Sequence, residues 1–149
     1  MEHLEENHLL NNTQHSFRAS LSTESVLLTL TNKLYKNIDN ANTSLITLCN
    51  LSKAFDSVHH ETLMKKLKEQ QIDTFWFRDY LRERTKYARI NKYVSDKLGI
   101  SLGVPQGSVL GPILFLIYVT NFLQHVSDCF VIQYTDDTQF IHTGNRPNS

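Results

Sequence analysis

The chain has 149 residues, enough for one domain with a hydrophobic core, and its 40% hydrophobic and 20% charged residues are ordinary for a globular protein. The formal net charge is zero, so composition alone does not indicate a nucleic-acid partner. The acidic start lacks the apolar core of a signal peptide, and the longest apolar stretch, 109–123, is too short and too interrupted to span a bilayer. Cys49 and Cys129 lie in apolar runs without metal-ligand spacing. These features predict an intracellular protein, nuclear or cytoplasmic, that has reduced cysteines and does not contact a membrane.

Three helices are predicted in the first part of the chain. Apolar residues recur at helical spacing over 22–38, with Ser22 or Thr23 as the N-cap. Two further helices are expected at about 61–70 and 74–84. The side chains expected to face inward from these two helices are those of Leu63, Met64, Leu67, Phe75, Trp76, Tyr80 and Leu81.

Short strands and one more helix complete the predicted fold. The apolar run 45–49 is typical of a buried strand. Short strands are then predicted over 87–91 and 94–100, followed by a loop with glycines and a proline over 103–108. A helix over about 109–125 is apolar nearly all round, and we therefore expect it to be buried. Helices interleaved with a small, largely antiparallel sheet indicate an α+β fold.

Two adjacent carboxylates, Asp136 and Asp137, lie in the middle of a predicted β-hairpin. The runs 129–134 and 138–143 on either side are rich in β-branched and aromatic residues, as strands require, which leaves 135–137 for the turn. Like charges side by side at a hairpin tip repel each other. One interpretation is a solvated aspartate turn, and the other is a site for a hard divalent cation such as Mg²⁺.

Basic residues are concentrated in the middle of the chain. Between Lys65 and Lys97 there are ten Lys and Arg and five Asp and Glu, whereas the remainder has five basic and ten acidic residues. A basic middle combined with the acidic hairpin suits a protein that holds an anionic backbone and a metal ion in one molecule. A solvated helix face is the alternative explanation of such a run.

Four segments carry motifs in a characteristic order. They are residues 14–18 with Ser22-Thr23, residues 51–58 (Leu-Ser-Lys-Ala-Phe-Asp-Ser-Val), residues 103–112 (Gly-Val-Pro-Gln-Gly-Ser-Val-Leu-Gly-Pro) and residues 134–139 (Tyr-Thr-Asp-Asp-Thr-Gln). This pattern resembles the palm of reverse transcriptases, specifically those of non-LTR (LINE-type) retrotransposons, from near residue 4 to about Thr143. The resemblance implies a polymerase palm/fingers-like fold over 1–149, with a fingers remnant and helix at 1–43 and the palm core at 44–143, where the motifs occupy 50–58, 103–112 and 134–139.

The resemblance also implies an activity and a set of site residues. The activity would be that of an RNA-directed DNA polymerase, which uses an RNA template, a DNA primer, dNTPs and two Mg²⁺ ions. Asp136 would be the main metal ligand and Asp137 its weaker companion. The implied nucleotide-binding residues are Lys53, Phe55, Pro105, Gln106 and Gly107, and those implied to meet nucleic-acid phosphates are Arg18, Arg78 and Arg82. Read without the resemblance, Phe55 also suits a buried aromatic after a strand, 105–107 a plain turn, and Lys53 a solvated charge.

One departure from the family pattern concerns the chemistry directly. The family's first palm motif opens with an aspartate, and the equivalent residue here, six before Asp56, is Asn50. The missing carboxylate is the one that bridges both ions, and a neutral amide bridges two cations poorly. Asp56 lies beyond the strand end, where a helix-cap role explains it better. Ser16, His59 and Thr135 also replace family residues, and the set indicates drift in an element no longer selected for polymerisation.

By the resemblance, we expect three segments that flank this core in the family's polymerase to be missing. These are the first fingers strands, the primer-gripping segment and the helical thumb. We therefore predict a reverse transcriptase domain fragment that is catalytically impaired and inactive in this form. The alternative is a non-catalytic remnant that binds nucleic acid or a protein partner.

Overall fold

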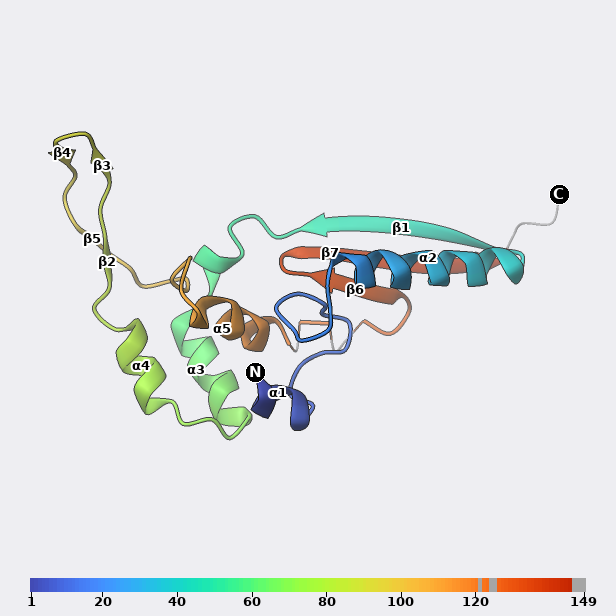
Figure 1. The fold of residues 1–149 in the computed structure, drawn as a ribbon, viewed down its shortest axis with the longest axis horizontal. Helices are drawn as coiled ribbons and strands as arrows, with labels where there is room; N and C mark the ends of the chain where they lie inside the picture. Colours follow the sequence, from blue (N-terminus) through green and yellow to red (C-terminus); the bar gives the residue numbers. More distant parts are fainter. Residues whose placement is uncertain (121, 124–125, 146–149) are drawn as a thin grey trace. The chain divides into compact units, whose positions relative to one another are not determined.

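The computed structural model describes residues 1–120, 122–123 and 126–145, and its helices and small antiparallel sheets confirm the predicted α+β class (Figure 1). The chain forms two compact units. Unit 1 consists of Met1–Ser52 and the described residues from Val119 onward, and unit 2 consists of Lys53–Tyr118. Among the described residues, no helix is both long enough and apolar enough to cross a membrane.

Unit 1 is built on an antiparallel sheet of three strands, in the order β1-β7-β6 (Figure 1). The strands are β1 (Asn42–Asn50), β6 (Phe130–Tyr134) and β7 (Asp137–Asn145), and two helices accompany them, α1 (Glu2–Glu6) and α2 (Thr23–Asp39). The predicted cap at Ser22 is confirmed, because its side chain accepts a hydrogen bond from the Ser25 backbone N–H.

The helix α2 packs on one face of this sheet. Val26 of the helix forms a buried cluster with Ile132 and Ile141 of the hairpin, and Leu30, Leu34 and Tyr134 pack against the cluster. At the other end of the helix, the buried Asn37 side chain donates hydrogen bonds to Ser44 Oγ at 2.7 Å and Thr143 Oγ1 at 3.0 Å. Apolar packing and a polar clamp therefore fix α2 along the sheet.

The prediction that 45–49 is a buried strand is wrong. Leu45 and Leu48 are 66% and 74% exposed, and Cys49 is exposed as well. The reason is topological: within the described residues, β1 pairs with β7 alone and is therefore an edge strand. A short apolar run has the same appearance in sequence whether its strand lies at the centre or at the edge of a sheet.

Unit 2 contains a 3₁₀ turn, η1 (Phe55–Ser57), and three helices: α3 (His60–Glu69), α4 (Phe75–Leu81) and α5 (Leu110–Val119), the last of which belongs to this unit up to Tyr118. Leu63 and Leu67 are fully buried, as predicted. The Lys66 ammonium donates a hydrogen bond to the carbonyl oxygen of Tyr118, and burial lowers the pKa of this lysine.

Residues from Leu114 to Ile117 are buried, which confirms the expected burial of α5. The predicted continuation of this helix to 125 is wrong at Thr120, where the chain turns, and residues 121, 124 and 125 lie outside the described part.

The helix α4 is shorter than predicted and buries fewer side chains. Of the four expected to face inward, only Leu81 is buried, whereas Phe75 and Trp76 are 81% and 54% exposed. The Trp76 ring instead stacks on Tyr80 at a centroid separation of 5.2 Å, and the Arg84 guanidinium lies 4.4 Å from the Tyr80 ring centroid. These three side chains form a ladder at helical spacing along α4 and beyond its end.

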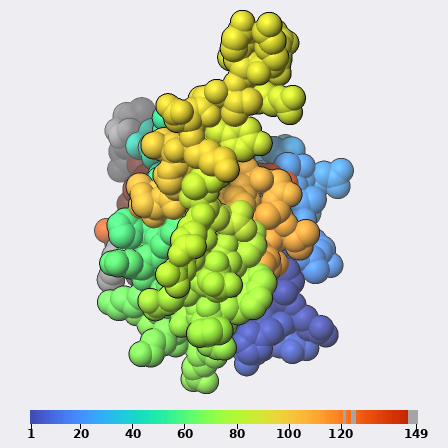
Figure 2. Space-filling view, turned by 90° about the vertical axis from the view of Figure 1, so that its left-hand side faces the viewer, coloured from blue at the N-terminus to red at the C-terminus, as the bar shows by residue number. Residues whose placement is uncertain are grey.

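The two strands predicted over 87–91 and 94–100 form one long, interrupted hairpin. Its base pairs β2 (Thr85–Lys86) with β5 (Leu98–Gly99), and its tip pairs β3 (Arg89–Ile90) with β4 (Tyr93–Val94). We call residues 85–99 the ribbon. Figure 2 shows the ribbon in yellow, projecting beyond the green helices of unit 2.

Candidate active site

The paired aspartates lie on the predicted hairpin, which the structure confirms. The turn contains Thr135 and Asp136, because Tyr134 already pairs with Asp137 as the first residue of β7. The expected three-residue turn is therefore one residue shorter. Asp136 is half-buried and Asp137 is exposed. Thr135 has a φ of +57°, which is costly for a β-branched residue and must be supported by its surroundings.

A segment near the N-terminus supplies this support. The Thr135 backbone N–H donates a 2.9 Å hydrogen bond to Ser16 Oγ, and Ser16 in turn donates to Gln14 Oε1 at 3.0 Å. Both Ser16 and Gln14 are buried, and backbone hydrogen bonds join 13–15 to Gln133 of β6. Ser16 therefore has a structural role, which the interpretation as drift missed. The sequence feature that could have indicated this role is the Ser16 hydroxyl itself, at a position where the family pattern has glycine.

Asn50 meets Asp137 directly across the sheet. The two residues are cross-strand partners at the end of β1 and the start of β7. The Asn50 Nδ2 donates a hydrogen bond of 2.8 Å to Asp137 Oδ1, and the Leu51 N–H donates to the Asp136 carbonyl at 3.2 Å. The structure thus brings together the three predicted catalytic positions, with an amide and a carboxylate in direct contact.

This donor set has two adjacent carboxylates, Asp136 and Asp137, and an amide at Asn50 where the family pattern has an aspartate. Mg²⁺ is commonly held by one or two carboxylates together with water or substrate oxygens. Asp136 and Asp137 are the carboxylates at this position. Among the residues that the structure describes, no group of three or more His, Cys, Asp and Glu side chains is suited to hold a metal ion. The Asn50 amide, moreover, presents a donor rather than a negative charge to Asp137.

Hydrogen bonds join the motif at 103–112 to the motif at 51–58, within unit 2. Gly103 donates from its N–H to the Val58 carbonyl at 2.7 Å, and the Val104 N–H donates to the Phe55 carbonyl at 2.9 Å. Gly103 has a φ of +88°, and a Cβ there would lie 2.9 Å from the Asp56 Cα. The glycine therefore allows the loop to approach this chain's own backbone at Phe55 and Asp56.

Gln106 and Pro105 line a cavity of about 650 Å³ at the base of the ribbon. The Gln106 amide donates a 3.1 Å hydrogen bond to Asp56 Oδ1, and the cations Arg84 and Lys86 line the same cavity. The predicted helix-cap role of Asp56 is therefore wrong: α3 begins after His59, no side chain caps it, and Asp56 binds Gln106 instead. The amide and the two cations that line this cavity are groups that can bind an anionic ligand.

The other predicted nucleotide-binding residues differ in their surroundings. Phe55 is half-buried, and its ring stacks on the buried Phe115 ring at a centroid separation of 4.4 Å. Phe55 therefore packs against α5. Gly107 is exposed, with open space around the position of a Cβ. Lys53 is exposed and has a φ of +56°. Their assignment to nucleotide binding stays a prediction.

Arg18 is engaged inside unit 1. Its guanidinium pairs with the Glu5 carboxylate through two hydrogen bonds of 2.8 and 2.5 Å, and it donates to the carbonyls of Asn11 and Gln14. The hydrogen bond from Arg18 holds the pKa of Glu5 below its usual range. A phosphate would have to compete with these partners, so the contacts present give Arg18 a structural role. Burial lowers the pKa of the neighbouring His15, and the Arg18 charge adds to this effect.

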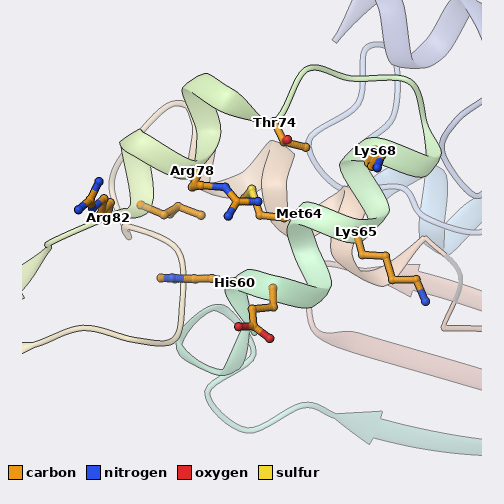
Figure 3. A pocket seen from close by; sticks show the side chains of 9 residues that line it. His60, Met64, Lys65, Lys68, Thr74, Arg78 and Arg82 are labelled. Carbon is orange, nitrogen blue, oxygen red and sulfur yellow. The ribbon is translucent and has the colours of Figure 1, made fainter.

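Arg78 and Arg82 lie beside a groove of about 530 Å³ between α3 and α4 (Figure 3). Figure 3 shows Arg78 pointing toward Met64, whereas Arg82 and Lys65 point away from each other. Arg82 also pairs with Glu83 at 3.0 Å, with both side chains largely exposed. Arg78 is therefore the better candidate of the two for an anion contact.

The predicted site residues thus form two sets, one in each unit. Asn50, Asp136 and Asp137 come together in unit 1, together with the supporting Ser16. The implied nucleotide-binding residues, with Arg78 and Arg82, belong to unit 2.

Comparison with known proteins agrees with the motifs. The family model for reverse transcriptase (RNA-dependent DNA polymerase) matches residues 1–147. Among curated proteins of Drosophila melanogaster, the RNA-directed DNA polymerase from mobile element jockey is 29% identical over 84% of this chain and 15% of its own length. The probable polymerases from transposon BS and transposon X-element are 27% and 30% identical, over 94% and 70% of this chain and 16% and 12% of their lengths. A solved structure of apo telomerase from Candida Tropicalis, truncated from the C-terminal domain, is similar with a TM-score of 0.48 and 16% identity, over 87% of this chain and 30% of that chain.

The chain belongs to the reverse transcriptase (RNA-dependent DNA polymerase) family. Its relatives among mobile elements confirm the predicted likeness to reverse transcriptases of the non-LTR, LINE-type retrotransposons. The chain spans about an eighth to a sixth of the length of the curated relatives it matches.

Proposed function

We propose that this chain is a palm/fingers-like part of a LINE-type reverse transcriptase whose catalysis is impaired at Asn50. The partners would be those of an RNA-directed DNA polymerase: an RNA template, a DNA primer and dNTPs. The observation that carries the proposal is the 2.8 Å hydrogen bond from the Asn50 amide to the Asp137 carboxylate.

This hydrogen bond changes what the site requires. An aspartate at position 50 would place a second carboxylate next to Asp137, and two like charges at that separation need a cation or a proton between them. The amide instead satisfies the Asp137 oxygen with an N–H donor, so the site is stable without metal. The sequence change therefore removes an anionic ligand and also removes the reason for an ion to bind there.

With an aspartate restored at position 50, Asp136 and Asp137 would help to hold Mg²⁺, and such an ion would neutralise negative charge on the oxygens of a bound substrate. The loss of a bridging carboxylate removes several kcal/mol of stabilisation from a two-ion centre, which corresponds to a rate lower by on the order of 10³-fold or more. In unit 2, the cavity lined by Pro105, Gln106, Arg84 and Lys86 would bind the anionic part of a nucleotide. Gly107 follows Gln106 in the sequence, and Lys53 and Phe55 lie just before Asp56, which also lines the cavity.

Calorimetric titration with Mg²⁺ and with Mn²⁺ tests this proposal on four proteins. They are the unmodified chain, Asn50→Asp, the double variant Asn50→Asp/Asp136→Ala, and Asn42→Asp as a control at the far end of the same strand. We expect binding only for Asn50→Asp. Tight binding by the unmodified chain, or primer extension that is lost on Asp136→Ala, would contradict catalytic impairment at Asn50.

A binding role without catalysis is the second candidate function. It is favoured by the cations of unit 2, which line the groove between α3 and α4 and also lie along the ribbon. The two functions differ in metal dependence, because binding through lysine and arginine persists in a chelator and weakens with salt.

A further inference from the structure

The strand β1 forms an open edge of the sheet in unit 1 (Figure 1). Within the described part of the chain, one side of β1 pairs with β7 and its other side has no strand partner. The register with β7 runs one to one from Asn42 to Asn50, so no bulge bends the edge away. The strand therefore presents a regular row of backbone donors and acceptors to which another strand can pair.

The side chains of β1 do not protect this edge. Its nine residues include no charged residue and no proline, which are the groups that most often prevent two strands from pairing edge to edge. Leu45, Ile46 and Leu48 are all exposed. Leu45 lies on one face of the sheet, whereas Ile46 and Leu48 lie on the face that carries α2, because they alternate with Leu45 and share their face with Ser44, which contacts Asn37 of α2. Both faces of the open edge are therefore apolar.

Apolar side chains of α2 extend this surface on one face of the sheet. Leu27 and Ile38 are 61% and 66% exposed and lie about three helical turns apart, so they share one side of α2. The Lys33 ammonium projects from the opposite side of the helix and lies over the ring of Phe130 in β6. Because β6 and β1 lie on opposite sides of β7, Leu27 and Ile38 are on the side of β1. An apolar border of the helix therefore runs beside the open edge.

The opposite edge of the sheet, at β6, is partly covered by the chain itself. The His15 N–H donates a 2.9 Å hydrogen bond to the Gln133 carbonyl, and the Gln133 N–H donates to the Thr13 carbonyl at 2.8 Å. Gln14 forms a parallel bridge with the same residue of β6. Edge pairing is therefore directed to β1, and a pair formed there by two copies closes on itself instead of growing into a fibre.

We propose that β1 pairs with β1 of a second copy of this chain, antiparallel and about a two-fold axis at Thr47. This register sets Ile46 opposite Leu48 and Leu45 opposite Cys49, so every exposed apolar side chain of the strand meets an apolar group or a thiol. The two Thr47 residues meet at the axis, where paired threonines can hydrogen-bond to each other. The product is a continuous sheet of six strands, three from each copy.

A second copy suits this surface better than a charged partner does. The strand offers no charge for a basic or acidic partner to bind, and the formal net charge of zero means that two copies do not repel each other at long range. The two-fold axis places both α2 helices on the same face, where Leu27 and Ile38 of each copy border the joined strands. The pairing does not use the carboxylates of Asp136 and Asp137, so it can hold or fail independently of the proposed function.

Sedimentation velocity over a range of concentrations tests this pairing on the unmodified chain, Thr47→Lys, Thr47→Glu and an equal mixture of the two variants. We expect the unmodified chain to dimerise, and each variant alone to dimerise about tenfold more weakly or worse, because like charges would meet at the axis. The mixture should recover the dimer, since lysine then meets glutamate. Tyr35→Lys adds the same charge on the side of α2 away from the sheet, at a position 63% exposed, and should leave the dimer unchanged. Circular dichroism checks that each variant folds.

Disulfide trapping tests the register of the pair. In a Cys49→Ser/Cys129→Ser background, Thr47→Cys should give a disulfide-linked dimer on mild oxidation, because directly opposite residues have Cα atoms about 4.5–5.5 Å apart, within the range of a disulfide. Tyr35→Cys in the same background should stay monomeric on a denaturing gel.

Three results would overturn the proposal. The first is a chain that stays monomeric up to about 1 mM. The second is a dimer that Thr47→Lys and Tyr35→Lys weaken equally. The third is a chain that does not dimerise and instead binds a strand-forming peptide of another sequence at β1, which would assign the edge to a different partner.

Discussion

Asn50 and Asp137 face each other as cross-strand partners, and the 2.8 Å hydrogen bond between their side chains joins the end of β1 to the start of β7. The contact occupies the position where the family pattern has two carboxylates. A single change from carboxylate to amide therefore converts a pair of groups that repel each other into a donor and an acceptor.

Replacing Asn50 by aspartate should lower the stability of the chain in the absence of metal. Asn50→Asp removes the hydrogen bond and places two negative charges side by side, which we expect to cost about 1–2 kcal/mol in the free energy of unfolding at this exposed position. Added Mg²⁺ should restore much of that loss, because binding to the folded state stabilises it. Urea unfolding at neutral pH, with and without Mg²⁺, measures both effects.

Asn42→Asp is the matched control for this measurement. Asn42 lies on the same strand, but its cross-strand partner is Asn145 rather than an acidic residue. Its stability should change little and should not respond to Mg²⁺. If Asn50→Asp were as stable as the unmodified chain in a chelator, the contact with Asp137 would not contribute to stability.

The Ser16 hydroxyl should prove necessary for the aspartate-bearing turn. Ser16→Ala leaves the Thr135 N–H without its 2.9 Å acceptor, and we expect a loss of about 1–3 kcal/mol. Ser127→Ala removes an exposed hydroxyl and should be nearly neutral. Denaturant unfolding compares the two variants, and equal stabilities would mean that Ser16 does not support the turn.

Two glycines of the 103–112 motif should differ in their tolerance of a side chain. Gly103 and Gly107 both have positive φ, but a Cβ meets backbone atoms at 2.9–3.0 Å only at Gly103 and open space at Gly107. Gly107→Ala should therefore cost about 1 kcal/mol for backbone strain alone. Gly103→Ala should cost about 2 kcal/mol more, because the loop must move away from Asp56. Similar unfolding free energies for the two variants would show that the close approach is not maintained in solution.

The ion pair between Glu5 and Arg18 should make stability depend on acidity. Because the folded state lowers the pKa of Glu5, the stabilisation is present above the unfolded pKa and is lost as the pH falls through the lower, folded pKa. Glu5→Gln should cost about 1–3 kcal/mol at neutral pH, and its difference from the unmodified chain should shrink on acidification. Thermal unfolding across the acidic range measures this trend. Glu2→Gln, on the exposed face of the same helix, should not show it.

Helices and strands with strong local signals were predictable from the sequence. The apolar spacing and the Ser22 cap gave α2 to within one residue at each end, and β-branched residues around a short polar turn gave the β6–β7 hairpin. The four motif segments identified the family because the order and spacing of their residues are properties of the chain itself. The position of Asn50, six residues before Asp56, could be counted directly.

Contacts between distant segments could not be predicted in this way. The exposure of β1 depends on which strands pair with it, and the exposure of Phe75 and Trp76 depends on what packs against α4. The role of Ser16 was missed because its partner is Thr135, more than a hundred residues away along the chain.

The sequence by itself determined the family of this protein and the replacement of one aspartate of the family motif by Asn50, because both are matters of which residue occupies which place in a motif. Only the tertiary structure decided what the Asn50 amide binds, since its partner depends on the register between β1 and β7. In the same way, the sequence supplied the basic and aromatic residues of the ribbon, but their exposure follows from a hairpin that is anchored only at its base. A side chain's identity is local, whereas its partners are set by packing.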